Sequence, residues 1–181
     1  MIKYLRIKFV FFCFILFKLS YSEANVEKIF NYLESFQSMK SDFIQINNNG
    51  DVFSGNIKIL RPGKVRIEYK EIPLLIISDG KKVATINKKL KNIVFYNLDD
   101  LPVSLLLFQN FNSKALNIIS VKEGENKIQI KLTEQKYSEK GFVEIIFEKK
   151  PFEMKKWTVF RGDNTKTEVL LSNLNFGDDL Y

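Results

Sequence analysis

Apolar residues recur at three- and four-residue spacings in the stretch from Asn25 to Met39. They are Val26, Ile29, Phe30, Leu33 and Phe36. Because this spacing places side chains on one stripe of an α-helix, the pattern predicts an amphipathic helix over residues 25–39. The other side of this helix carries charged and amide residues, so we expect its apolar stripe to lie against an apolar surface.

Beyond Met39, apolar and polar residues alternate, as they do in a strand that has one buried and one exposed face. Residues 127–132, with the sequence Lys-Ile-Gln-Ile-Lys-Leu, are the clearest example. Turn sequences such as Asn49-Gly50 and Asp79-Gly80 separate the runs. The pattern therefore predicts a long antiparallel meander of about ten or eleven strands. These run over residues 43–47, 53–60, 65–69, 74–77, 82–86, 93–96, 118–122, 127–132, 142–148, 156–160 and 168–174.

Two segments depart from the alternation. Residues 74–77 are apolar at every position, which predicts a strand that is buried on both faces. Leu101-Pro102 opens an apolar run that continues to Phe108, and proline is favoured in the first turn of a helix, so we expect a short second helix over residues 101–112. Since a sheet of about ten strands tends to curl, the elements predict an apolar interior, either filled by side chains or open to a ligand.

Residues 1–22 differ from the rest of the chain. An apolar run over residues 9–17 follows a basic start and precedes the small residue Ser22, which is typical of a secretory signal peptide. The basic residues are Lys3, Arg6 and Lys8. We therefore expect a signal peptide over residues 1–22 and a single domain over residues 23–181. The alternative is an uncleaved membrane anchor, although the run is well short of the about 20 apolar residues that a spanning helix needs.

Charge and composition exclude several function classes. The net charge of +7 falls to +3 over residues 23–181, which carry 24 basic and 21 acidic side chains, so we expect no nucleic-acid partner. The chain has no histidine and its one cysteine is Cys13, which removes the usual catalytic triads and the common zinc sites. The acidic pairs Asp99-Asp100 and Asp178-Asp179 are interpreted as solvated turn residues rather than a glycosidase pair. We expect no catalytic residue, no metal site and no cofactor, and hence no enzyme.

Five lysines flank one predicted hairpin: Lys81, Lys82, Lys88, Lys89 and Lys91. One interpretation is a solvated sheet edge, where lysines discourage the pairing of strands between molecules. The other is a docking patch for acidic lipid headgroups or for an acidic partner.

A series of short motifs extends over nearly the whole of residues 23–181. The motifs are Phe43-x-Gln45, Gly55, Arg61-Pro62, Arg66-Ile67-Glu68-Tyr69, Pro73, Ile77-Ser78-Asp79-Gly80-Lys81, Leu101-Pro102, Leu105-Leu106-Leu107, Trp157 and the run from Val169 to Asn173. In order and spacing they resemble the outer-membrane lipoprotein carrier (LolA-type) family. The resemblance implies a mainly β (α+β) fold, a curved antiparallel half-barrel of about 10–11 strands with a helical lid.

The same resemblance implies a function and partners. A protein of this kind is a monomeric periplasmic chaperone that shelters the acyl chains of lipoproteins in a hydrophobic cavity. It receives its cargo from a lipoprotein-releasing ABC transporter of the inner membrane and delivers it to a receptor at the outer membrane. Two other functions remain open: a carrier of free lipids or glycolipids on the same fold, and a periplasmic sensor or interaction module.

Residue roles also follow from the resemblance. Arg61 matches the family arginine that bonds backbone groups of the lid in the closed state, and the alternative is an ordinary surface arginine at a strand end. The expected wall of the acyl-chain cavity consists of inward positions of the strands: Ile57, Ile59, Val65, Ile67, Tyr69, Ile76 and Phe95. The expected lid residues are Ile29, Phe30, Leu33, Leu106 and Phe108. Val65 and Ile67 stand where many members have aromatic residues.

Overall fold

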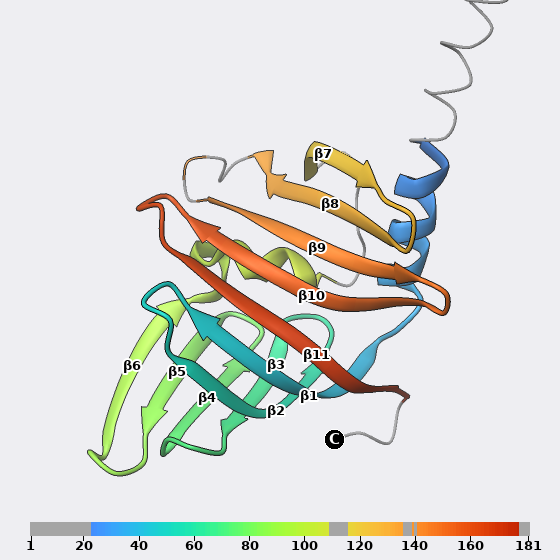
Figure 1. Cartoon of the computed structure of the whole chain (residues 1–181). Helices are drawn as coiled ribbons and strands as arrows, with labels where there is room; N and C mark the ends of the chain where they lie inside the picture. Colours follow the sequence, from blue (N-terminus) through green and yellow to red (C-terminus); the bar gives the residue numbers. More distant parts are fainter. Residues whose placement is uncertain (1–22, 109–115, 136–138, 140, 178–181) are drawn as a thin grey trace, which may run out of the picture.

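The computed structural model describes residues 23–108, 116–135, 139 and 141–177 (Figure 1). The expected signal peptide over residues 1–22 and the acidic pair Asp178-Asp179 lie outside the described residues. Within the described ranges, no helix has the length and hydropathy that crossing a membrane requires.

The N-terminal helix is described over residues 23–34. Its stripe is buried as predicted, since Ile29 and Leu33 are 0% exposed. The prediction that the helix continues to Met39 is wrong, because β1 (Ser38–Asn47) begins there. Met39 is paired with Ile59 on one side and with Phe176 on the other. Pairing with two distant strands therefore overrides the local helical spacing at this point.

Eleven strands follow the helix within the described residues, and each contains or closely overlaps a predicted run. After β1 they are β2 (Val52–Leu60), β3 (Lys64–Tyr69), β4 (Leu74–Asp79), β5 (Lys82–Asn87), β6 (Asn92–Asn97), β7 (Leu116–Glu123), β8 (Lys127–Glu134), β9 (Gly141–Lys149), β10 (Phe152–Arg161) and β11 (Lys166–Phe176). All the paired neighbours are antiparallel.

The strand order corrects the prediction of one continuous meander. The order is β6-β5-β4-β3-β2-β1-β11-β10-β9-β8-β7, so the first strand pairs with the last in the middle of the sheet. A plain meander would have paired β6 with β7, but these two strands form opposite edges (Figure 1). We call β1–β6 the N-terminal half-sheet and β7–β11 the C-terminal half-sheet.

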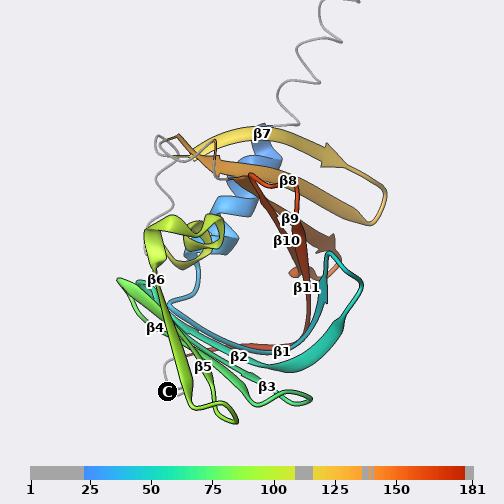
Figure 2. The ribbon, with the colours of Figure 1, turned by 90° about the vertical axis from the view of Figure 1, so that its left-hand side faces the viewer.

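The sheet bends into an open half-barrel, and the N-terminal helix lies on its concave side (Figure 2). Two 3₁₀ segments, η1 (Leu98–Asp100) and η2 (Pro102–Leu107), follow β6 and cover the same side. The second predicted helix is therefore a 3₁₀ segment with proline in its first turn, and residues 109–112 of that prediction lie outside the described residues. The predicted fold, a mainly β half-barrel with a helical lid, is confirmed. We call the N-terminal helix and η2 the lid.

One apolar cluster fills the space between the lid and the concave face. The C-terminal half-sheet contributes side chains at 0% exposure, among them Ile130, Ile145 and Phe147. The prediction that residues 74–77 are buried on both faces is wrong, because Leu75 is buried while Ile76 and Ile77 are only partly covered. Leu75 lies on the convex face beside Ile86, whereas Ile76 lies on the concave face, where the lid leaves it partly uncovered.

Gly55 allows an aromatic ring to lie across β2. A Cβ atom at this position would meet the Glu68 carbonyl oxygen at 2.1 Å and Cε1 of Phe43 at 2.7 Å, which is too close for any other residue. Phe43 is paired with Gly55 in the register and is 3% exposed. The Phe43-x-Gln45 and Gly55 motifs therefore meet in space and fix the wall of the half-barrel at this point.

Candidate functional site

Arg61 lies directly after β2, where the N-terminal half-sheet meets the lid. Its backbone N–H donates to the Gln37 carbonyl oxygen at 2.9 Å, which ties the turn after β2 to the segment between the N-terminal helix and β1. Two residues on, the N–H of Gly63 donates to the Leu107 carbonyl oxygen of η2 at 3.0 Å. This turn therefore contacts both parts of the lid through its backbone.

The guanidinium of Arg61 is 4% exposed and joins the two parts of the lid. It donates to the Leu33 carbonyl oxygen, to that of Phe36 at 3.2 Å, and to that of Leu106 at 2.8 and 3.2 Å. Its carbon also lies 4.1 Å from the centre of the Phe36 ring. The planar fork of arginine suits this arrangement, because it presents several donors in fixed directions.

Burial perturbs the charge of Arg61. Loss of hydration lowers the pKa of this guanidinium to about 10, and the nearby carboxylate of Glu34 raises it in part. The group still carries its proton at neutral pH, so its hydrogen bonds to the carbonyl oxygens are charge-assisted. The structure thus buries Arg61 against the lid, and does not leave it at the surface as in the alternative interpretation.

The predicted lid residues differ in burial. Ile29, Leu33 and Leu106 are buried against the concave face, while Phe30 and Phe108 are only partly buried. Sequence reasoning missed two further contributors, Leu105 at 1% exposure and Phe36, whose ring lies beside the Arg61 guanidinium. Phe36 belongs to the apolar stripe of the sequence, but its contact with Arg61 joins residues 25 positions apart and has no local signal.

The strand register shows which predicted wall residues share a face. Ile57, Ile67 and Ile76 form one row across β2, β3 and β4. The neighbouring rows on the same concave face contain Ile59 with Val65, and Gly55 with Tyr69. Six of the seven predicted wall residues therefore lie on one surface. Ile57, Ile59 and Val65 are buried, whereas Ile67, Tyr69 and Ile76 remain partly exposed.

Tyr69 is the polar member of this surface. Its hydroxyl donates to Oε1 of Gln45 at 2.7 Å, and its ring meets the Phe43 ring edge-on, with centroids 5.3 Å apart. Burial raises the pKa of the Tyr69 hydroxyl, so the group stays neutral under physiological conditions. The residue therefore adds a neutral, hydrogen-bonded side chain to a wall whose five other predicted members are apolar.

Phe95 does not fit the prediction. It is paired with Ala84, and Ala84 with Ile77, which places Phe95 on the convex face at 64% exposure. The concave positions of β6 are Val94 and Tyr96, since Val94 continues the row through Thr85 and Ile76. Residues 93–96 are all apolar or aromatic, so the sequence pattern carried no signal for the choice between the two faces.

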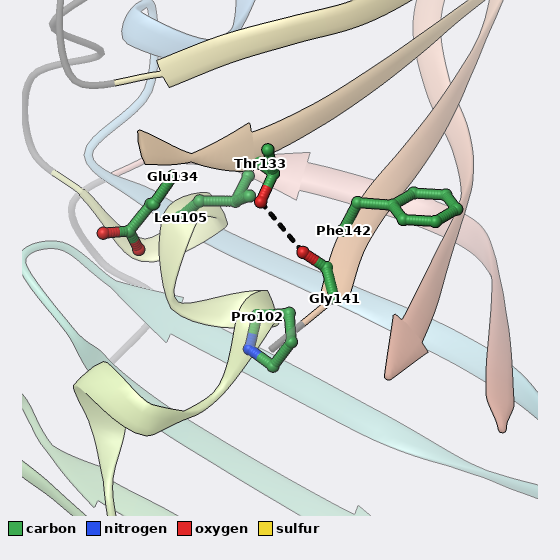
Figure 3. A pocket seen from close by; sticks show the side chains of 6 residues that line it. All are labelled: Pro102, Leu105, Thr133, Glu134, Gly141 and Phe142. Carbon is green, nitrogen blue, oxygen red and sulfur yellow. Dashed lines mark hydrogen bonds between the residues drawn. The ribbon is translucent and has the colours of Figure 1, made fainter. Parts of the chain in front are cut away.

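A small pocket lies where η2 meets the end of the C-terminal half-sheet (Figure 3). Its empty volume is about 200 Å³, part of it open to solvent, and its walls are Pro102, Leu105, Thr133, Glu134, Gly141 and Phe142. Oγ of Ser104 donates to the Glu134 carboxylate at 3.0 Å close by. This contact ties η2 to β8 and adds a polar anchor to the apolar packing.

The lid is also tied to the C-terminal half-sheet. The backbone N–H of Met154 in β10 donates to the Tyr32 hydroxyl oxygen at 3.2 Å, and Nδ2 of Asn25 donates to the Glu123 carboxylate at 2.8 Å. The Tyr32 ring packs edge-on against Phe147 and Phe152, with centroids 5.4 and 5.6 Å away. The geometry therefore describes an apolar concavity closed by an apolar lid, with polar contacts at its margins.

Comparison with known proteins gives a family match. The family described as "Outer membrane lipoprotein carrier protein LolA" matches residues 34–180. The outer-membrane lipoprotein carrier protein of Dechloromonas aromatica (strain RCB) is 28% identical over 143 residues, which cover 74% of this chain and 68% of that protein.

Solved structures share the fold at much lower identity. A DUF1329 family protein from Desulfovibrio piger has a TM-score of 0.53 and 9% identity, covering 87% of this chain and 92% of its own. A LolA superfamily protein from Nitrosomonas europaea has a TM-score of 0.45 and 8% identity, covering 84% and 93%. The first of these similarities supports the architecture alone.

Proposed function

The chain belongs to the outer membrane lipoprotein carrier protein LolA family, and from this premise we propose that it is a periplasmic carrier of lipoproteins. In this proposal the acyl chains of the cargo lie between the concave face of the sheet and the lid. The observation that carries the proposal is the guanidinium of Arg61, which holds both parts of the lid through backbone carbonyl oxygens. These hydrogen bonds, which we call the Arg61 joint, can break and re-form without any covalent step.

The chemistry of the concavity suits hydrocarbon. Each methylene group that leaves water for an apolar site contributes about 0.8 kcal/mol, so an acylated protein needs shelter to cross an aqueous compartment. The row formed by Ile57, Ile67 and Ile76 offers a wall of branched aliphatic side chains. Since Ile67 and Ile76 are only partly covered in the closed structure, they are the first wall residues that cargo would meet.

The energetics of Arg61 favour a lid that opens. Hydrogen bonds that involve a charged group contribute about 1.5–3 kcal/mol each, which favours closure. Removing the guanidinium from water works against this gain, and the lowered pKa of Arg61 reflects that cost. Since the two effects oppose each other, burial of several methylene groups of cargo can offset closure in this proposal.

The partners in this proposal are acylated lipoproteins, an inner-membrane lipoprotein-releasing ABC transporter and an outer-membrane receptor. Closure of the empty lid competes with cargo for the same space. A carrier that closes after delivery therefore releases its acyl chains more completely than one that stays open. The protein acts as a monomer without catalysis, and a signal peptide over residues 1–22 directs it to the periplasm.

The test replaces Arg61 by leucine. Without the guanidinium, closure no longer competes with cargo, and each 1.4 kcal/mol of lost closure tightens apparent cargo binding about tenfold. We expect Arg61→Leu to accumulate as a lipoprotein complex and to deliver its cargo at least about tenfold less well to an acceptor. The measurement is mass spectrometry of the protein purified from the periplasm, together with a transfer assay.

Arg66→Leu is the matched control. Arg66 lies one strand further on, is 43% exposed, and pairs with Glu68 at 2.7 Å on the convex face. We expect this variant to transfer cargo normally. Unchanged transfer by Arg61→Leu would refute the role of the joint. Recovery of free lipid in place of acylated protein would favour a free-lipid or glycolipid carrier, and recovery of an empty chain with a protein partner would favour a sensor.

A further inference from the structure

The convex face of the N-terminal half-sheet carries apolar side chains up to its open edge. In the register, Ile77, Ala84 and Phe95 form one row across β4, β5 and β6. Leu75, Ile86 and Ile93 form the next row. Exposure rises toward the edge strand, where Ile93 is 50% and Phe95 is 64% exposed. We call these six residues the edge patch.

Basic charge is concentrated around the edge patch. Residues 23–181 have a net charge of +3, from 24 basic and 21 acidic side chains. Residues 77–97 alone carry five lysines and one acidic residue, Asp79, a net charge of +4, which leaves the rest of residues 23–181 at −1. Three of these lysines occupy the turn between β5 and β6. The same turn contains Leu90, which is 71% exposed.

The pattern of the edge strand differs from a protected sheet edge. Protected edges carry charged residues on the strand itself, which prevents pairing with another molecule. Here the lysines lie in the turn before β6 and not on the strand. The strand itself carries four apolar or aromatic residues that are each at least 40% exposed: Ile93, Val94, Phe95 and Tyr96. A combination of exposed apolar residues and nearby lysines is typical of a surface that lies in a membrane interface.

We propose that the β5–β6 hairpin and the edge patch form a docking surface for an anionic phospholipid membrane. The lysines of the turn meet the acidic headgroups, and Leu90, Ile93 and Phe95 enter the boundary between headgroups and acyl chains. Glu68 lies on the same convex face, but its carboxylate is paired with Arg66 at 2.7 Å and with Lys88 at 3.8 Å. The charge that this surface presents is therefore positive.

The location of this surface indicates a role in the transfer of acyl chains to a membrane, and this role rests on the proposed carrier function. The concave side of β6 carries Val94 in the row that continues through Thr85 to Ile76 and Ile67. The same strand thus ends the cargo wall on one face and the edge patch on the other. In Figure 1 this strand lies at the free margin of the sheet, with its turn projecting away from the lid. Acyl chains that leave the wall at β6 would enter the membrane directly.

The experiment measures binding of the intact exported protein, without cargo, to vesicles. One set contains phosphatidylethanolamine and phosphatidylglycerol, and the other contains only phosphatidylcholine. We expect binding to the anionic vesicles that weakens with added salt. Replacement of Lys88, Lys89 and Lys91 by glutamine should weaken it on the order of a hundredfold, since each lysine near an anionic surface contributes about fivefold. Phe95→Ser should weaken it about tenfold.

Matched controls lie in the C-terminal half-sheet. Ile119→Ser changes a residue of β7 that is 52% exposed. The triple glutamine replacement of Lys122, Lys127 and Lys150 removes three exposed lysines, which lie in β7, in β8 and in the turn after β9. Both controls should bind anionic vesicles as the unmodified protein does. Absence of binding to anionic vesicles, equal binding to both vesicle types, or equal losses in variants and controls would each overturn the proposal.

The outcome is distinguishable from that of the carrier test. The vesicles contain no lipoprotein, so failure to bind them leaves the Arg61→Leu result untouched. If the triple variant at Lys88, Lys89 and Lys91 binds vesicles normally but loses cross-linking to a periplasmic protein, the surface serves an acidic protein partner and the membrane proposal is wrong.

Discussion

The two halves of the sheet have the same alternation of apolar and polar residues, but their concave side chains differ in exposure. In the C-terminal half-sheet, concave side chains such as Ile130, Val143 and Ile145 are 0% exposed beneath the lid. In the N-terminal half-sheet, Ile67 and Ile76 on the same concave face stay partly open. The comparison teaches that the lid buries the concave face of the C-terminal half completely but leaves part of the N-terminal half uncovered.

The contacts of the lid agree with this difference. Toward the C-terminal half-sheet the lid combines aromatic packing around Tyr32 with hydrogen bonds to Met154 and Glu134. Toward the N-terminal half-sheet its polar contacts gather at the turn from Arg61 to Gly63. We therefore expect opening to separate the lid from the N-terminal half-sheet.

The largest expected effect concerns the stability of the two halves. Phe147 is 0% exposed and stacks on Phe152 with centroids 5.2 Å apart, so Phe147→Ala should lower the free energy of unfolding by about 3–5 kcal/mol. Ile76→Ala, at a partly exposed position of the other half, should cost about 1 kcal/mol. Urea denaturation measures both. Similar losses for the two variants would contradict the division between core and cover.

A smaller effect is expected for local opening in Arg61→Leu. The Gly63 N–H donates to η2, so its hydrogen exchange should accelerate about thirtyfold if the joint contributes about 2 kcal/mol to closure. Amides between β8 and β9, where Ile130 is paired with Ile145, should exchange at nearly unchanged rates. Hydrogen exchange followed by NMR distinguishes the two regions. Uniform acceleration would mean that the lid does not open separately.

The smallest effect concerns acid, and here the halves should behave alike. At the end of β4, the backbone N–H groups of Lys82 and Lys81 lower the pKa of the Asp79 carboxyl from 3.8. The hydroxyl and N–H of Thr165 lower the pKa of Asp163 in the turn after β10.

Both carboxylates stabilise the folded state fully above the unfolded pKa of 3.8, and this contribution is lost as pH falls through the lower folded pKa. NMR titration should find both midpoints below 3.8. Asp79→Asn and Asp163→Asn should each remove part of the loss of stability in acid. A normal midpoint at either residue would refute its turn contacts.

Much of the fold could be predicted because its signals are local. Short runs of alternating residues identified most strands, uniformly apolar runs identified β4 and β6, and Pro102 marked the start of η2. The end of the N-terminal helix could not be predicted, because Met39 pairs with residues far away in the sequence. The central pairing of β1 with β11 is likewise a choice between distant partners with similar patterns.

The candidate site was predictable only in part. Alternation placed Ile57, Ile67 and Ile76 on one face, but the contacts of Arg61 came from a family resemblance and not from any local pattern. Phe95 was placed on the wrong face because the face depends on the pairing of Asn87 with Asn92 across the turn. A turn one residue longer or shorter would have exchanged Phe95 with its neighbours.

The pairing of β1 with β11 has a consequence for the order of assembly. Phe43 meets Leu171 in the centre of the sheet, so the central ladder needs residues that leave the ribosome far apart in time. A chain that emerges N-terminus first can form the β2–β6 hairpins early, but it keeps one side of β1 unpaired until the last described strand arrives. Whichever hairpins form first, the two half-sheets become one sheet only when β11 is available to join β1 to β10.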